Sequence, residues 1–512
     1  MSSQTATGVP AVMAVDQGTS ATKSLLMDAT GAIVARGSVS LSQHHPHPGW
    51  VEQDPILIRD SVMKAAASSL SGLDGQVLGL GLSTQRESAV IWDKQTGQPL
   101  GPVLGWQDRR TVERARQLTA DGVGSTVRDS TGLPLDPMFS ALKIEWLLDS
   151  VDPDRRLSRQ DRIAAGTIDS WLVFCLTGEH RIEAGNASRT QQMNLDTVDW
   201  DPELLEIFRI PAMVLPRILP STAPSGVLGI SGLENARVNA VMGDSHSALY
   251  AHGVRDAGTV KATYGTGSSI MGLLGDSGLG AGSGLVRTVA WHDGQARYAF
   301  EGNILSTGAT ALWLARLFDA DVAHLDSLAR TVEDSGNVNI VPAFAGLGAP
   351  WWDENAQALI SGFDLGTSTA HLARAAFESI ALQIEDVLTA AESAVGSRVG
   401  AVLADGGPTS NSWLMQLQAD LSQRTVLRSS VPDLSALGVA HMAAVESGLC
   451  ERGTIESLDR NRTSFTPELN PSGAAARRSS WSNAVARSRW TPASTPITEE
   501  PARDAMASTR RS

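Results

Sequence analysis

The chain has 512 residues, of which 42% are hydrophobic and 19% are charged, and its formal net charge is −14. This length exceeds what one hydrophobic core supports, so we expect two domains. The acidic balance gives no electrostatic support to nucleic-acid binding, and the sequence shows neither an apolar run long enough to span a membrane nor a secretory signal. Its two cysteines, Cys175 and Cys450, suggest no disulfide framework and no metal cluster. These features predict a cytoplasmic protein that binds neither nucleic acid nor membranes.

The N-terminal part of the chain alternates between strand-like and helix-like patterns. An amphipathic helix is predicted over residues 54–70, with Asp54 as its N-cap and Pro55 at the first helical position. The run that follows the helix is fully apolar, which is typical of a buried parallel strand. Strands are predicted at residues 11–16, 23–28, 32–41, 77–85 and 88–100.

The second half of the chain shows the same alternation of strand-like and helix-like patterns. A strand, a Gly-Thr-Gly turn and another strand are predicted within residues 258–274, like the hairpin at the start of the chain. Alternation of strands and helices indicates an α/β fold. We therefore predict two α/β domains, at residues 10–252 and 253–470, then a terminal helix and a tail expected to be disordered within residues 471–512. The other predicted elements are strands at 295–304 and 399–407 and helices at 306–318, 369–395, 411–423 and 474–490.

The first hairpin turn carries groups suited to a phosphate and a metal ion. Backbone N–H groups and small hydroxyls in such a turn form a good cradle for an anion. Asp16 precedes the turn and could hold Mg²⁺, which proteins usually bind through one or two carboxylates and the phosphates of the substrate. Lys23, after the turn, could add positive charge. One such hairpin is more often a structural turn, but two hairpins and a strand ending in Asp-Gly-Gly ahead of a helix favour nucleotide binding.

A series of short motifs runs from about Val12 to Cys450. They are VDQGTSATK (15–23), PGWVEQDP (48–55), STQRES (83–88), GWQDRRT (105–111), DPMFSALKIEWLL (136–148), GTIDSWLVFCLTG (166–178), NASRT (186–190), MGDSHSAL (242–249), TYGTGSS (263–269), PAFAGLGAPWWD (342–353) and ADGGPTSNSWLMQ (404–416). In number, order and spacing they resemble the FGGY family of carbohydrate kinases and, within it, most of all the glycerol kinases. The resemblance implies a duplicated α/β domain of the actin, hexokinase and Hsp70 type (ribonuclease H-like), with a nucleotide cleft between the copies.

The resemblance also implies an enzyme that phosphorylates a small polyol or sugar with ATP and Mg²⁺. Asp244 matches the family's general base, which takes the proton of a primary hydroxyl during phosphoryl transfer. Arg86 and Glu87 match the pair that hydrogen-bonds substrate hydroxyls, and a guanidinium beside a carboxylate complements groups that both donate and accept. Trp106 matches an aromatic residue that packs on the carbon face of the substrate.

Further matches imply the nucleotide site. Asp16 resembles the Mg²⁺-associated carboxylate, and Lys23 stands where glycerol kinases usually have Arg, so it would act as a point charge rather than as a fork. The other matches are Gly18, Thr19 and Ser20 in the first hairpin, Thr266 and Gly267 in the second, Gly308 and Leu312 on a helix beside the nucleotide, and Gly407 and Asn411 at the adenosine end.

Three pocket positions depart from the glycerol kinase pattern. Met138 replaces a Tyr, Ser245 replaces a Gln after the catalytic Asp, and Ser269 replaces a Phe after the second hairpin. A site built around a three-carbon triol would lose packing and leave hydroxyls unpaired. The extra room and the two serines suit a polyol or open-chain keto sugar of four to six carbons. The alternative is a diverged glycerol kinase that acts on glycerol in a looser site.

Two other classes of protein share this fold. A non-catalytic, sugar-binding regulator would be favoured by loss of the base, but Asp244 and both hairpins are present. A chaperone-type or cytoskeletal ATPase has no use for the motifs at residues 83–88 and 105–111. Fold alone cannot choose among these classes, so the site residues must. Relatives often form dimers or tetramers, and a homo-oligomer is left open.

Overall fold

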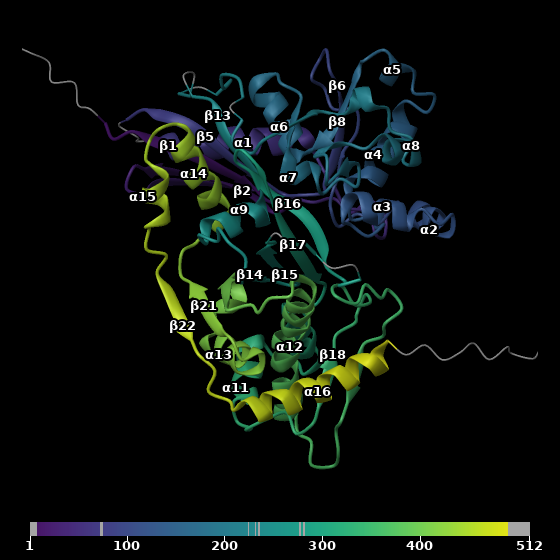
Figure 1. Cartoon of the computed structure of the whole chain (residues 1–512), viewed down its shortest axis with the longest axis vertical. Helices are drawn as coiled ribbons and strands as arrows, with labels where there is room; N and C mark the ends of the chain where they lie inside the picture. The colour runs from purple at the N-terminus through teal and green to yellow at the C-terminus, as the bar shows by residue number, and fades with distance from the viewer. Residues whose placement is uncertain are drawn as a thin grey trace, which may run out of the picture.

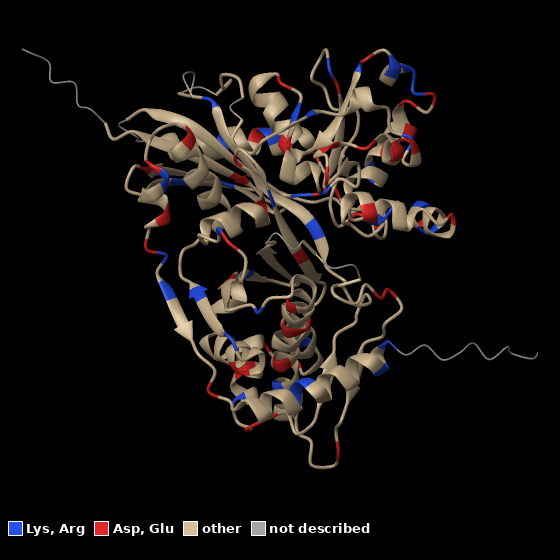
Figure 2. Cartoon of the chain, in the orientation of Figure 1, with Lys and Arg blue, Asp and Glu red and all other residues tan. Residues whose placement is uncertain are grey.

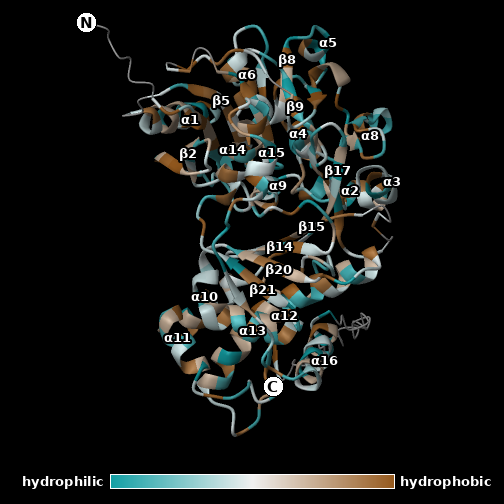
Figure 3. Cartoon of the chain, turned by 60° about the vertical axis from the view of Figure 1, so that its left-hand side comes forward, coloured by the Kyte–Doolittle hydropathy of each residue, from teal (hydrophilic) through white to brown (hydrophobic). Residues whose placement is uncertain are grey.

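The computed structural model describes residues 8–71, 75–223, 225–230, 232–233, 236–275, 278–279 and 282–489. It has two lobes, each built around one mixed sheet (Figure 1). Figure 3 shows one lobe above the other, with α9 (Asp244–Ala251) and α14 (Leu434–Glu446) in the N-terminal lobe and α10 (Gly308–Leu317) and α12 (Thr369–Val395) in the C-terminal lobe. The tail predicted to be disordered lies, from residue 490 onward, outside the described residues.

The N-terminal sheet has the strand order β13-β5-β1-β2-β3. The strands β1, β2 and β3 form an antiparallel meander, while β5 and β13 run parallel to β1. The helix predicted after the meander exists as α1, and Asp54 caps it by accepting hydrogen bonds from the backbone N–H groups of Ile56 and Leu57. The bounds are β1 (Ala11–Gln17), β2 (Ala21–Asp28), β3 (Ile33–Ser40), α1 (Pro55–Leu70), β5 (Val77–Thr84) and β13 (Val238–Gly243).

The C-terminal sheet repeats this order. Within its seven strands, β16-β17-β15-β14-β20-β21-β22, the middle five again place an antiparallel meander beside two parallel strands. The predicted fold class, a duplicated actin-like α/β fold, is thereby confirmed. The bounds are β14 (Thr259–Tyr264), β15 (Ser268–Leu273), β16 (Val286–His292), β17 (Ala296–Ile304), β20 (Ala401–Asp405), β21 (Thr425–Ser429) and β22 (Arg462–Phe465).

Helices cover both sheets. In the C-terminal lobe the long helix α12 begins and ends as predicted, and its apolar face joins the main core. The helix α14 comes from the C-terminal half of the chain yet packs on β1, β5, β13 and α9 of the N-terminal lobe. The other elements here are α11 (Val322–Ala329), β18 (Asn339–Val341), β19 (Leu359–Ser361), η2 (Gly407–Ser410), α13 (Ser412–Ser422), α15 (Arg452–Glu456) and α16 (Pro471–Ser488).

The N-terminal lobe also carries an inserted layer with its own apolar cluster. It contains the four-stranded sheet β4-β7-β6-β8 and two small two-stranded sheets. Charged residues of both signs are spread over both lobes (Figure 2). Among the described residues, no helix is both long and apolar enough to cross a membrane. The remaining bounds are β4 (Glu52–Gln53), β6 (Ala89–Asp93), β7 (Val103–Leu104), α2 (Val112–Ala120), α3 (Gly124–Thr131), α4 (Ser140–Val151), α5 (Arg156–Arg159), β8 (Ile163–Thr167), α6 (Ile168–Thr177), β9 (Arg181–Glu183), α7 (Ala184–Ala187), β10 (Met193–Asn194), β11 (Asp199–Trp200), α8 (Pro202–Ile207), η1 (Ala212–Val214) and β12 (Arg217–Leu219).

Candidate active site

The carboxyl ends of three parallel strands bring the predicted catalytic residues together. Asp16 at the end of β1 is in register with Ser83 of β5, and Ser83 is in register with Met242 of β13. Asp244 therefore follows its strand at the same edge at which Arg86 follows β5. This edge is where open α/β sheets bind their ligands.

Asp244 is the first residue of α9, and its side chain is 37% exposed. Its Oδ1 atom accepts a 2.6 Å hydrogen bond from the backbone N–H of Ser245 and lies 3.2 Å from Nε of Arg86. No hydrogen bond from the described part of the chain reaches Oδ2. One oxygen is thus fixed, and the other is available to a ligand.

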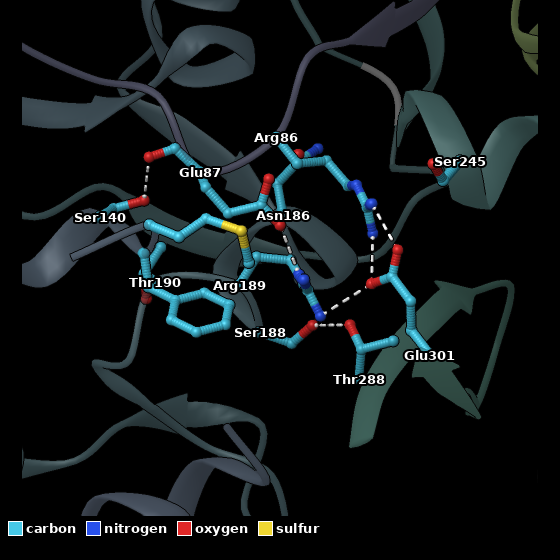
Figure 4. Close-up of polar contacts among 12 residues, drawn as sticks. Arg86, Glu87, Ser140, Asn186, Ser188, Arg189, Thr190, Ser245, Thr288 and Glu301 are labelled. Atoms are coloured by element: carbon cyan, nitrogen blue, oxygen red, sulfur yellow. Dashed lines mark hydrogen bonds and ion pairs between the residues drawn. The ribbon is translucent and has the colours of Figure 1, made fainter. Parts of the chain in front are cut away.

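Arg86 and Glu87 belong to a row of alternating charges, which we call the charged chain: Glu87, Arg189, Glu301, Arg86 and Asp244. Figure 4 shows Glu87, Arg189, Glu301 and Arg86. Arg86 donates to both oxygens of Glu301, over 2.7 and 3.0 Å. Arg189 donates from Nε to Oε1 of Glu87 over 2.6 Å and lies 3.0 Å from Oε2 of Glu301. Apart from Asp244, every member is buried. Arg86 and Glu87, predicted as a pair, are thus connected through two other residues.

Arg189 and Glu301 were not predicted as site residues. Arg189 lies inside the motif at residues 186–190, and Glu301 lies on a predicted strand, but neither position signals an ionic partner. Burial alone would raise the pKa of Glu301, yet the guanidinium groups of Arg189 and Arg86 hold it below its usual range. Glu301 is therefore an ionised, fully buried carboxylate at the centre of the charged chain.

Lys143 was also missed, although it lies in a quoted motif. Its ammonium donates to the backbone carbonyls of Glu87, Met138 and Phe139. Burial lowers the pKa of Lys143 to about 7. Glu87 has a left-handed backbone, with φ of 64°, which a non-glycine residue adopts only where its surroundings hold it. Lys143 thus fastens the turn that bears Glu87 to the loop that bears Met138.

The other residues predicted to bind the substrate that accepts the phosphoryl group are Ser245, Ser269, Met138 and Trp106. Ser245 lies in the first turn of α9, and Ser269 donates to Oε1 of Glu301 over 2.9 Å, so both lie beside the charged chain. Met138 packs against a small apolar cluster formed by Leu133, Phe139 and Val286. Trp106 is 38% exposed, and its indole N–H donates to the Thr19 hydroxyl over 3.1 Å. Its backbone N–H donates to the Ser88 hydroxyl over 3.0 Å, so Trp106 links the motif at residues 83–88 to the first hairpin.

Asp16 is the residue predicted to associate with Mg²⁺. Burial, and the negative charge of Asp244, raise its pKa to about 7, against a hydrogen bond from Ser83 that lowers it. Among the described residues, no ion pair to Asp16 occurs and no cluster of His, Cys, Asp or Glu could hold a metal unaided. This fits Mg²⁺, which completes its coordination shell with phosphates and water.

The first hairpin closes tightly, because the N–H of Gly18 donates to the carbonyl of Ala21 over 3.0 Å. Thr19 is half-buried and Ser20 is exposed. The ammonium of Lys23 lies 3.0 Å from Oδ1 of Asp433, which precedes α14. In this state the predicted phosphate-binding lysine is therefore paired with an acid from the other end of the sequence.

The second hairpin is docked on the start of α10. The N–H groups of Gly308 and Ala309 donate to the carbonyls of Gly265 and Thr266, over 3.1 and 3.0 Å. A Cβ on Gly308 would lie 2.5 Å from the Gly265 carbonyl oxygen, so this position requires glycine. Thr266 is exposed and Gly267 half-buried.

At the predicted adenosine end, Leu312 is 43% exposed and a Cβ on Gly407 would meet open space. Asn411 caps α13, accepting hydrogen bonds from two backbone N–H groups, and also donates to Asp326. The structure thus gives Asn411 a structural role, while Leu312 and Gly407 border open surface.

Comparisons with known proteins agree with this architecture. The N-terminal domain of the FGGY family of carbohydrate kinases matches residues 11–249, and the C-terminal domain matches residues 260–447. The apulose kinase of Pectobacterium atrosepticum is 40% identical over 492 residues, covering 94% of this chain and 99% of that protein. A glycerol kinase of Alkalilimnicola ehrlichii is 40% identical over 488 residues, covering 93% and 98%.

Two solved structures are similar over the same extent. Plasmodium falciparum glycerol kinase with ADP superposes with a TM-score of 0.88 at 28% identity, covering 94% of this chain and 99% of that one. A ligand-bound xylulose kinase from Lactobacillus acidophilus gives a TM-score of 0.85 at 21% identity, covering 94% and 98%, which shows the shared fold. The chain therefore belongs to the FGGY family of carbohydrate kinases, which are phosphotransferases that act on an alcohol group.

Proposed function

We propose that this kinase transfers the γ-phosphoryl group of ATP to a primary hydroxyl of a polyol or keto sugar of four to six carbons, with Asp244 as general base. The observation that carries the proposal is the state of Asp244: Oδ1 is fixed by Ser245 and Arg86, while Oδ2 accepts nothing from the described residues. Such an oxygen can take the hydroxyl proton as the phosphoryl group arrives. Phosphoryl transfer needs mainly positioning and charge stabilisation, so one placed carboxylate suffices.

The acceptor's other hydroxyls have partners at the opposite end of the charged chain. Oε1 of Glu87 is taken by Arg189, while no hydrogen bond from the described residues reaches Oε2. A hydroxyl that donates to Oε2 and one that donates to Asp244 would be bound at two separate points. The guanidinium of Arg86 is occupied by Glu301 and Asp244, so we assign it to holding Asp244 rather than to recognising a hydroxyl.

The acceptor size rests on Met138, Ser245 and Ser269. Ser245 and Ser269 lie beside the charged chain and are smaller than the Gln and the Phe of the glycerol kinase pattern. Met138 packs in the apolar cluster, where the glycerol kinase pattern has the phenol of a Tyr. Relatives do not decide the question, because a protein named apulose kinase and one named glycerol kinase are equally similar. Glycerol remains the second candidate substrate because one of these two relatives is named a glycerol kinase.

We assign ATP to the two hairpins, with Gly18, Thr19, Ser20 and Lys23 on one side, and Thr266, Gly267, Gly308, Leu312 and Gly407 on the other. Asp16 would hold Mg²⁺, which when bound neutralises phosphate charge and stabilises the leaving group. Release of Lys23 from Asp433 would free its charge for a phosphate. Both cysteines are free thiols, which supports a cytoplasmic location.

The experiment is an ADP-release assay with Mg-ATP across glycerol, erythritol, the pentitols and the common ketopentoses and ketohexoses, with Asp244→Asn as control. Strong turnover on one longer acceptor, lost in the control, is the expected result. Turnover confined to glycerol would refute the assigned acceptor size. Undiminished turnover by Asp244→Asn would refute the assigned base.

A further inference from the structure

Glu301 is the one member of the charged chain that comes from the C-terminal lobe. It lies on β17, whereas Arg86 follows β5 and Arg189 follows α7 in the N-terminal lobe. Figure 4 shows Glu301 between the two arginines, with dashed lines to both. Hence the two arginines that hold the acceptor-facing carboxylates are both anchored across the boundary between the lobes.

Glu301 cannot itself contact the acceptor. Its Oε1 accepts from Arg86 and Ser269, over 2.7 and 2.9 Å, and its Oε2 accepts from Arg86 and lies 3.0 Å from Arg189. Its side chain has no exposed surface. Any influence of Glu301 on the reaction therefore passes through the residues that it holds.

We propose that Glu301 is a positioning residue, which sets the places of Asp244 and Glu87 and makes acceptor binding depend on where the C-terminal lobe lies. This inference rests on the proposed function. Removal of its charge would leave two buried guanidinium groups without their shared partner. Without Glu301, Arg86 would pair more closely with Asp244, and Arg189 with Glu87. Each arginine would then draw its carboxylate away from the position in which it contacts the acceptor.

The test compares Glu301→Gln and Glu301→Asp with Glu378→Gln. Glu378 is a suitable control, since it is a buried glutamate of the same lobe, paired with Arg374 and Arg477 on α12 and α16. Thermal melting establishes that each variant folds. Steady-state kinetics then give KM for ATP, KM for the acceptor and kcat, using the acceptor that the wild type phosphorylates best, glycerol included.

We expect Glu301→Gln to raise KM for the acceptor about tenfold or more and to lower kcat, with KM for ATP unchanged. Glu301→Asp should recover part of the loss because it restores the charge, and Glu378→Gln should lower only the melting temperature. An unchanged acceptor KM in Glu301→Gln, or the same kinetic change in Glu378→Gln, would overturn the proposal. If Glu301→Gln does not fold, Glu301→Asp is compared with the wild type alone: its charge is kept but its shorter side chain cannot hold both arginines, so the acceptor KM should still exceed that of the wild type, and an unchanged acceptor KM would overturn the proposal.

The two proposals fail separately. If glycerol is the best acceptor, the proposed acceptor size is wrong, but the comparison of variants proceeds on glycerol. If the wild type turns over no acceptor, the variants are compared by the slow hydrolysis of Mg-ATP, in which water takes the place of the hydroxyl beside Asp244. Glu301→Gln should then slow hydrolysis and Glu378→Gln should not; equal rates would overturn the positioning role.

Discussion

Asp16 and Asp244 are two carboxylates at one sheet edge, and their mutual repulsion contributes to the raised pKa of Asp16. We expect Asp16→Asn to raise the Mg²⁺ concentration needed for half-maximal activity by about tenfold or more, because the proposed metal carboxylate is lost. The melting temperature should not fall, since the substitution removes a poorly solvated charge. Initial rates against Mg²⁺ at fixed ATP, with a melting curve, measure both. An unaltered Mg²⁺ dependence would remove Asp16 from the metal site.

Met138 offers a direct test of acceptor size. Met138→Tyr restores the phenol of the glycerol kinase pattern, so we expect kcat/KM for glycerol relative to the longer acceptor to rise by about tenfold. The ratio is measured with both acceptors in parallel. Met213→Tyr is a matched control, because Met213 is 44% exposed on η1 and should leave the ratio unchanged. A ratio that does not move in Met138→Tyr would mean that this residue does not select the acceptor.

Prediction from sequence succeeded for residues whose role shows in local pattern. Asp54 caps α1 as expected, because a cap depends on the two or three residues that follow it. Glu301 was missed because its partner Arg86 is 215 positions away, and Asp433 was missed as the partner of Lys23 over 410 positions. Ion pairs of this kind, the buried one of Glu301 and the exposed one of Lys23 alike, depend on which elements become neighbours in the fold, which no local pattern specifies.

At the scale of the element, the second hairpin and α10 act as one unit. Gly308→Ala places a Cβ against the Gly265 carbonyl, so the hairpin must shift away from α10. We expect KM for ATP to rise more than KM for the acceptor, since Asp244 and Glu87 lie in the other lobe and, of the residues assigned to the acceptor, Ser269 alone follows this hairpin. Gly453→Ala, where a Cβ meets open space in α15, should leave both constants unchanged. Steady-state kinetics with each substrate varied separates these outcomes, and an unchanged KM for ATP in Gly308→Ala would contradict the assignment.

The elements that the sequence predicts occur because their apolar periodicity matches the faces that they bury, whereas no element between residues 101 and 257 was predicted. The helix α12 has its predicted bounds, residues 369–395, and both hairpins occur where Gly-Thr turns interrupt apolar runs. Which sheet a helix covers was not predictable. The apolar residues of α14 fit either lobe, and the choice follows from its contacts with α9 and β5.

At the scale of the whole molecule, α16 is fastened to α12 by a titratable group. The indole N–H of Trp481 donates to Oδ2 of Asp386 over 2.8 Å, and burial raises the pKa of Asp386 to about 7. Because the folded pKa exceeds the ordinary value of 3.8, the stability contributed by the protonated form is complete below pH 3.8 and is lost as the pH rises through 7.

Asp386→Asn keeps an acceptor for Trp481 but cannot ionise. We therefore expect its melting temperature, relative to that of the wild type, to rise from about pH 4 to about pH 7 and then to level off. Melting curves of both proteins across this range measure the difference. A difference that is constant with pH would show that Asp386 does not titrate in the fold.

The position of α14 has a consequence for synthesis on the ribosome. The strands β1, β2 and β13 share one apolar cluster with α9 and α14, so that face of the first-made sheet is only partly covered until residue 446 has emerged. The N-terminal lobe therefore completes its core only late in translation, and a nascent chain halted between the lobes presents an apolar surface that invites chaperones or aggregation.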